Sequence, residues 1–85
     1  MYVEGKVQGV FFRQNTKDAA QLRNVKGWIR NLPDGRVEAV LEGEDEATQE
    51  VIDFCRVGPK GAYVSKIEIS REKYRGEFDD FQIMY

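Results

Sequence analysis

The chain has 85 residues, of which 41% are hydrophobic and 33% are charged, proportions typical of one soluble globular domain. A net charge of −2 argues against a nucleic-acid or anionic-membrane binder, because such proteins usually carry a basic face. The sequence has no histidine and one cysteine, Cys55, which excludes histidine-based catalysis, histidine metal ligands and an intrachain disulfide. We expect a single domain over residues 1–85.

The first half of the chain predicts a strand, a helix and a hairpin. Residues 2–7 alternate between apolar and polar side chains, as a strand does. Residues 12–24 carry an apolar stripe at helical spacing, and Asn24 suits the helix end because asparagine tolerates the left-handed conformation. Residues 26–31 predict a second strand. Residues 32–35, Leu-Pro-Asp-Gly, predict the turn that leads to a third strand at 37–41.

The second half predicts another helix and two further strands. Asp45 is a candidate N-cap for a helix that Gly58 and Pro59 end. Residues 62–69 predict a fourth strand, and the parity of Val64 relative to Ile67 predicts a bulge. Residues 71–80 are polar and predict a solvated loop, and residues 81–83 predict a short last strand.

The order β-α-β-β-α-β plus a short terminal strand predicts an α+β, ferredoxin-like two-layer sandwich. In that fold an antiparallel sheet carries two helices on one face.

Residues 5–13 predict an anion cradle. Gly5 and Gly9 bracket a loop whose N–H groups can face one point, and a helix start adds further N–H groups and the positive end of its dipole. Arg13 supplies a planar charged fork that matches phosphate oxygens. A cation at a helix N-terminus is unfavourable unless an anion binds there. The combination predicts a site for one small anion, in the first place a phosphate.

Asn31, 18 residues beyond Arg13, ends the second strand near the same region of the fold. A neutral amide is no base, but it can hold a water molecule by donating one hydrogen bond and accepting another. The pair therefore predicts catalysis by positioning and electrostatics.

The two segments together resemble the motifs of the acylphosphatase family. Gly5-x-Val7-Gln8-Gly9-Val10-x-Phe12-Arg13 is similar to the first motif, and Gly27-Trp28-Ile29-x-Asn31-x-x-Asp34-Gly35-x-Val37-Glu38 to the second. The resemblance extends through Gly58-Pro59 to Phe81-x-Ile83 and covers nearly the whole chain.

The resemblance implies hydrolysis of acyl phosphates to a carboxylate and inorganic phosphate, without metal, cofactor or phosphoenzyme. It implies that Arg13 and the loop N–H groups bind the phosphate and that Asn31 orients the attacking water. The phosphate-binding residues implied are Gln8, Gly9, Val10, Phe11, Phe12 and Arg13. The partners implied are a small acyl phosphate and inorganic phosphate, with a monomer as the family's default.

Four positions depart from the family pattern, and one of them is Asn24, which replaces a frequent glycine. Phe11 stands where glycine is frequent and is expected to reshape the pocket rim. Arg23 replaces a usually apolar residue, so either Leu22 takes over its packing or the arginine stem covers the core edge. Met84 replaces a frequent arginine, with no catalytic consequence assigned.

Two other functions compete with hydrolysis. One is a non-catalytic module of the same fold that binds an anion or a carbamoyl-phosphate-like group. The other is a nucleic-acid-binding domain of the RRM type, which the sequence disfavours because it lacks the aromatic K/R-G-F/Y motif.

The remaining notable residues are expected to be structural. Trp28 and Cys55 are interpreted as core residues, and the acidic cluster from Glu42 to Glu46 as a solvated face. With no apolar run near the roughly 20 residues that span a membrane and no secretory leader pattern, we expect a cytoplasmic protein without membrane or nucleic-acid partners.

Overall fold

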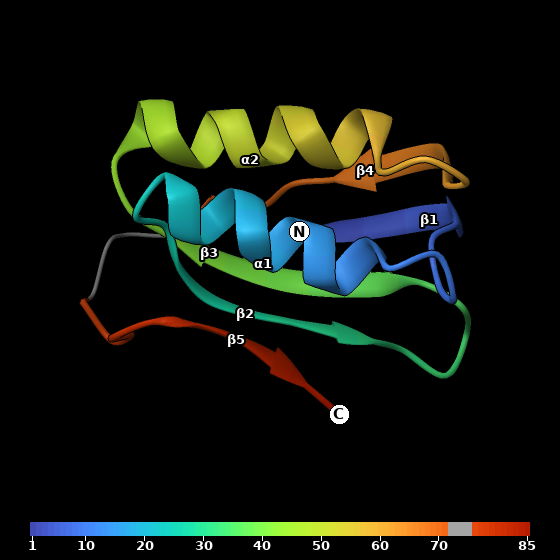
Figure 1. Ribbon diagram of the computed structural model, residues 1–85, viewed down its shortest axis with the longest axis horizontal. Helices are drawn as coiled ribbons and strands as arrows, with labels where there is room; N and C mark the ends of the chain where they lie inside the picture. The colour runs from blue at the N-terminus through green and yellow to red at the C-terminus, as the bar shows by residue number, and fades with distance from the viewer. Residues whose placement is uncertain (72–75) are drawn as a thin grey trace.

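The computed structural model describes residues 1–71 and 76–85 of the chain. The elements follow the predicted order (Figure 1), which confirms the ferredoxin-like α+β fold. They are β1 (Tyr2–Lys6), α1 (Phe12–Leu22), β2 (Lys26–Asn31), β3 (Val37–Glu42), α2 (Asp45–Val57), β4 (Tyr63–Glu68) and β5 (Phe81–Met84).

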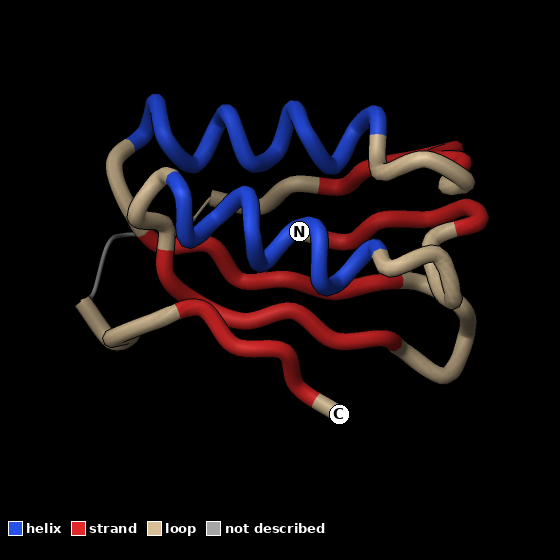
Figure 2. Tube along the Cα trace, in the orientation of Figure 1, coloured by secondary structure: helices blue, strands red, loops and turns tan. Residues whose placement is uncertain are grey.

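The strands form one five-stranded sheet with the order β4-β1-β3-β2-β5. β1 pairs antiparallel with β3 and β4, and β2 pairs antiparallel with β3. β5 lies parallel to β2. The antiparallel arrangement predicted from the sequence therefore holds for four strands, while the complete sheet is mixed. Figure 2 shows the sheet as one layer with both helices on the same side.

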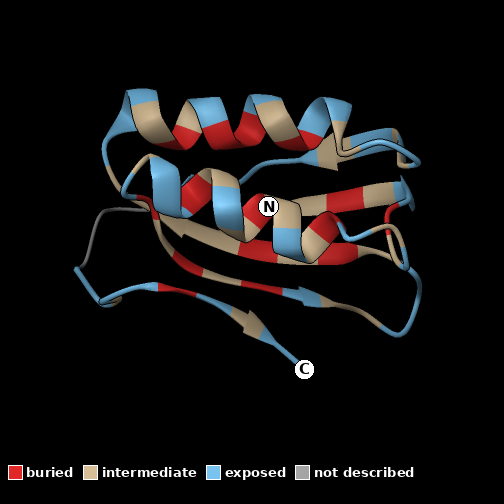
Figure 3. Ribbon diagram, in the orientation of Figure 1, coloured by how far each residue is buried: buried red, intermediate tan, exposed pale blue. Residues whose placement is uncertain are grey.

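The core lies between the helices and the sheet face that they cover (Figure 3). Alternate strand positions and one stripe of each helix are buried there. The largest fully buried side chains include Phe12, Phe81, Ile29, Val3, Val7, Val25, Val37 and Val51. Cys55 is buried as predicted, 3.6 Å from the Thr16 hydroxyl, and burial raises the pKa of its thiol to about 11. Cys55 is therefore a packing residue.

Gly5 belongs to the strand predicted over residues 2–7, and the second prediction for it, that it brackets the cradle loop, is wrong. It lies inside β1, where the register against β4 shifts: Glu4 pairs with Lys66 and Gly5 with Val64. This is the predicted bulge. Gly5 has φ 131°, and a Cβ there would collide with the Tyr63 carbonyl oxygen. Position 5 therefore requires a glycine, because β1 and β4 approach each other closely there.

Trp28 is not in the core, again contrary to the prediction. Ile29 is fully buried, and because strand side chains alternate, Trp28 lies on the sheet face without helices, half-buried. The Arg30 guanidinium is 5.3 Å from the centre of its ring. Two adjacent apolar residues left the parity of the strand ambiguous.

The start of α2 and the end of α1 differ in detail from the predictions. Glu44, one residue before Asp45, occupies the N-cap of α2, so Asp45 is not the cap. α1 ends at Leu22 rather than 24, and Asn24 adopts the predicted left-handed conformation with φ 56°. Leu22 is 83% exposed, so it does not take over the packing of Arg23. The half-buried Arg23 instead pairs with Glu50 of α2 at 3.0 Å.

The acidic residues Glu44, Asp45 and Glu46 are exposed, as predicted. Glu42 is half-buried and accepts the backbone N–H groups of Glu77 and Phe78 at 3.3 Å each. Part of the polar stretch 71–80, residues 72–75, lies outside the described residues. Within the part of the chain that the structure describes, no helix has the length and apolar character needed to cross a membrane.

Candidate active site

The loop between β1 and α1, residues 7–11, bends through two positive φ angles. Gly9 has φ 73° and Phe11 has φ 58°. A Cβ at Gly9 would meet no atom within 4 Å, so the backbone is open on that side and the glycine serves its conformation alone. A ligand can therefore approach the loop backbone closely.

The N-terminus of α1 is left electrostatically open. Phe11 occupies the N-cap without a side-chain cap, and the first turn contains no acidic residue. The first N–H groups of an α-helix have no partner within the helix, and they carry the positive end of its dipole. The N-terminus of α1 therefore offers unpaired N–H groups and positive potential, and both favour the binding of an anion.

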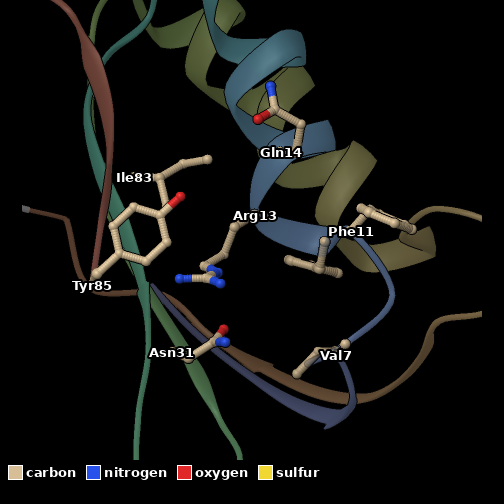
Figure 4. A pocket seen from close by; sticks show the side chains of 9 residues that line it. Val7, Phe11, Arg13, Gln14, Asn31, Ile83 and Tyr85 are labelled. Atoms are coloured by element: carbon tan, nitrogen blue, oxygen red, sulfur yellow. The ribbon is translucent and has the colours of Figure 1, made fainter.

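A pocket of about 440 Å³ lies at this end of the helix (Figure 4). It is lined by residues of the loop between β1 and α1, of α1, β2 and β5, and by the residue after β5. The residues that line it are Val7, Gly9, Phe11, Phe12, Arg13, Gln14, Asn31, Ile83 and Tyr85. Arg13 and Asn31, which are 18 positions apart in the sequence, therefore face one cavity, and Figure 4 shows their polar ends pointing toward each other.

Arg13 projects into the pocket from the first turn of α1. Its Nη1 donates a long, 3.4 Å hydrogen bond to the Met84 carbonyl oxygen, and the Tyr85 ring centre lies 4.9 Å from its guanidinium carbon. Neither contact neutralises the charge. The guanidinium therefore retains donors for an anionic ligand.

Asn31 carries an unsatisfied oxygen at the end of β2. Its Oδ1 is buried, and no described residue donates a hydrogen bond to it. Such a group costs about 1–3 kcal/mol relative to a satisfied one. A half-turn of the terminal amide would exchange its oxygen and nitrogen, so the amide can present either an acceptor or donors to the pocket.

The Gln8 side chain joins the cradle loop to the turn that follows Asn31. Its Nε2 donates to the Leu32 carbonyl at 2.9 Å and to the Arg36 carbonyl at 3.0 Å. The Arg36 carbonyl also accepts the Leu32 N–H at 2.8 Å, which closes the turn. Gln8 therefore fixes the position of the loop relative to the segment that carries Asn31.

The structure brings five of the predicted site residues to the pocket, namely Gly9, Phe11, Phe12, Arg13 and Asn31. Gln8 contacts the neighbouring turn with its side chain, and the Val10 side chain packs against the core. Only the backbone of these two residues is available for the predicted contact.

Sequence reasoning missed Val7, Gln14, Ile83 and Tyr85 as lining residues. The alternation that predicted strands at 2–7 and 81–83 did not show which strand β5 joins, so the approach of Ile83 and Tyr85 to Arg13 had no sequence signal. Gln14 could have been included as the neighbour of Arg13.

Comparison with known proteins gives one family. The acylphosphatase family model matches residues 1–83. An acylphosphatase from Syntrophus aciditrophicus is 55% identical over 85 residues, which cover 100% of this chain and 88% of the relative. An acylphosphatase from Pyrobaculum calidifontis is 58% identical over 85 residues, with 99% and 77% covered.

Solved structures agree. The crystal structure of an acylphosphatase from Bacillus subtilis matches with a TM-score of 0.95 at 33% identity, covering 99% of this chain and 93% of that one. The structure of full-length HypF in a phosphate- and nucleotide-bound form matches with a TM-score of 0.81 at 29% identity, covering 98% of this chain but 11% of that protein. The same fold therefore also occurs as a small part of a much larger chain.

Proposed function

Because this chain belongs to the acylphosphatase family and is a hydrolase that acts on acyl phosphates, we propose that it cleaves the carboxyl-phosphate bond by direct attack of a positioned water. Arg13 and the loop N–H groups hold the phosphate, and Asn31 orients the water. The observation that carries this proposal is that Arg13 and Asn31 line one pocket at the open N-terminus of α1.

The phosphate binds where the chain concentrates positive potential. The Arg13 guanidinium offers paired N–H donors, and the proposal adds the backbone N–H groups of residues 8–13 as further donors to the same phosphate. Charge on the equatorial oxygens changes during phosphoryl transfer, and preorganised donors stabilise it without rearrangement. The cradle therefore contributes to binding and to the transition state together.

The water attacks phosphorus in line with the departing carboxylate. The new bond joins the water oxygen to phosphorus, and the bond from phosphorus to the bridging oxygen breaks with its electron pair leaving on the carboxylate. One water proton passes to a non-bridging phosphate oxygen. The products are a carboxylate and inorganic phosphate, and the carboxylate is a good leaving group that needs no protonation.

Asn31 orients the water through its terminal amide. Its unsatisfied oxygen supports this role, since a water bound in the pocket would supply the missing hydrogen bond once a half-turn of the amide exposes that oxygen. Orientation removes entropy from the barrier, so the residue is expected to affect turnover more than binding.

The proposal includes catalysis by a monomer without a metal ion. In the described part of the chain, no group of three or more histidine, cysteine, aspartate or glutamate side chains is arranged to hold a metal. Arg13 supplies the positive charge that a metal would otherwise give. We also propose a cytoplasmic location, because the one cysteine of the chain, Cys55, is a buried free thiol, as is usual in a reducing compartment.

The test is phosphate release from acetyl phosphate and benzoyl phosphate, with and without excess EDTA. Turnover of both is expected, at equal rates in the two conditions. Loss of turnover in EDTA that added Mg²⁺ restores would contradict the metal-free mechanism. Absence of turnover in every condition, with inorganic phosphate still bound in calorimetry, would instead indicate the anion-binding module.

A further inference from the structure

Phe11 combines two unfavourable features in the free protein. Its backbone adopts φ 58° and ψ 27°, a left-handed conformation that penalises side chains other than glycine and asparagine. Its aromatic side chain is 79% exposed, whereas that of the next residue, Phe12, is 1% exposed. Phe12 packs the core and Phe11 contributes nothing to it, so Phe11 lacks a structural reason to be a large apolar residue.

The position of Phe11 is fixed by its own backbone. The Phe11 carbonyl accepts the Asn15 backbone N–H at 3.0 Å and the Asn15 Nδ2 at 2.8 Å. These two bonds anchor the left-handed residue to the first turn of α1. The direction in which its Cβ leaves the loop is therefore set by the fold.

That direction places Phe11 on the rim of the pocket. In Figure 4, Arg13 lies between Phe11 on one side and Tyr85 on the other, with Ile83 above Tyr85. Among the described residues that line the pocket, Arg13 carries the only charged side chain. Once the phosphate occupies Arg13, what remains of the lining for the acyl group is mainly aromatic and aliphatic.

We propose that Phe11 contacts the acyl group of the substrate, and that the preferred substrates are phosphates of uncharged, apolar carboxylic acids, aromatic ones above all. This inference rests on the hydrolysis proposed above. A substrate with a second phosphate on its acyl side would find no second cation in the described lining. An aryl ring would find aromatic surface, and one aromatic pair favours binding by about three- to tenfold.

Strain at functional positions persists where it serves a ligand. Glycine at position 11 would relieve the backbone and remove an exposed ring, so the phenylalanine is explained by a gain made only when the substrate is bound. The cradle then binds the phosphate, and the Phe11 side chain selects the carboxylic acid that is attached to it.

The experiment compares kcat/KM for benzoyl phosphate with kcat/KM for acetyl phosphate. The variants are Phe11→Gly and Phe11→Asn, which suit the left-handed backbone and therefore fold, and Phe11→Tyr, which keeps the ring. We expect the benzoyl-to-acetyl ratio to fall about three- to tenfold in the first two and to stay unchanged in the third. Leu22→Ala, which removes another exposed apolar residue at the far end of α1, should leave the ratio unchanged.

A second readout does not depend on turnover. Phenylphosphonate, methylphosphonate and inorganic phosphate are titrated by calorimetry into the wild type and Phe11→Gly. The variant should lose about three- to tenfold in affinity for phenylphosphonate while its affinities for the other two change less than about twofold.

The outcomes separate the two proposals. An unchanged benzoyl-to-acetyl ratio in both Phe11→Gly and Phe11→Asn, in enzymes that hydrolyse both substrates, overturns the role of Phe11 and leaves the hydrolysis intact. Lack of hydrolysis in the wild type overturns the proposed function, and the phosphonate titration then decides whether Phe11 still selects aryl ligands.

Discussion

The N-termini of the two helices differ in the charges that lie beside their positive dipole ends. α2 has Glu44 at its N-cap and carries Asp45 and Glu46 in its first turn, so its positive dipole end is matched by the chain's own carboxylates. α1 begins after Phe11 with no acid in its first turn and with Arg13 in place of one. The positive end of α2 is therefore compensated by acidic residues of the chain, whereas the positive end of α1 has no acidic residue in its first turn.

Under the proposed function, the contrast marks the place where stability is exchanged for function. Both helices lie on the same sheet face and bury one apolar stripe, so packing does not distinguish them. The difference lies in about one turn of sequence at each start. A helix N-terminus alone is not evidence of a site, but an N-terminus that repels its own cation, beside an unsatisfied amide in one pocket, is.

The sharpest way to break the comparison is Arg13→Ala. Losing a charge-assisted contact to phosphate costs about 2–4 kcal/mol, so kcat/KM for acetyl phosphate should fall about 30- to 1000-fold. The control is Arg56→Ala, in the last turn of α2, where a cation favours the dipole. It should keep full activity and lose slight stability in urea denaturation. A near-normal kcat/KM in Arg13→Ala would show that Arg13 at the N-terminus of α1 takes no part in the mechanism.

Asn31→Ala separates binding at the open end from chemistry there. Loss of an orienting group is expected to lower kcat on the order of 10²-fold, while inhibition by inorganic phosphate changes less than about threefold. Steady-state kinetics with phosphate as competitive inhibitor measures both. Gln21→Ala, an exposed amide on α1, serves as the matched control. If Asn31→Ala turned over at the wild-type rate, another group would have to orient the water.

The smallest effects are expected at the N-terminus of α2, whose first turn carries acidic residues. Asp45→Asn and Glu46→Gln each remove one charge from the first turn of α2, and each should lower the free energy of unfolding by about 0.3–1 kcal/mol at low salt. Urea denaturation at two salt concentrations checks this, since the effect should shrink as salt rises. Neither substitution should alter phosphate affinity. A loss of phosphate affinity would mean that the two helix ends are not independent.

The sequence predicted the elements well because the signals were local. Alternation located β1 and β3, and the turn residues located the hairpin between β2 and β3. The face of Trp28 was predicted wrongly because Ile29 beside it is also apolar, and only the packing of the helices decides which one is buried. Gly5 was assigned to the loop because a glycine signals a positive φ without saying whether a turn or a strand bulge needs it.

The site was predicted as far as its motifs reach. The two segments that carry Arg13 and Asn31 are brought to one pocket, as their combination indicated. The contribution of β5 was not predictable, because its parallel pairing with β2 depends on contacts between residues more than 50 positions apart. The link from Gln8 to the carbonyls of Leu32 and Arg36 was likewise invisible, since a glutamine side chain gives no local indication of its acceptors.

That link has a consequence for how the enzyme would fail. Because the Gln8 side chain donates hydrogen bonds to two carbonyls of the hairpin, it holds the cradle loop against the hairpin that follows Asn31. Opening the hairpin would withdraw both halves of the site at once, so inactivation on mild heating or in urea should be all-or-none and should precede unfolding of the core. Hydrogen exchange at the N–H groups of Gly35 and Leu32, which close the turn, would then report the fraction of active enzyme.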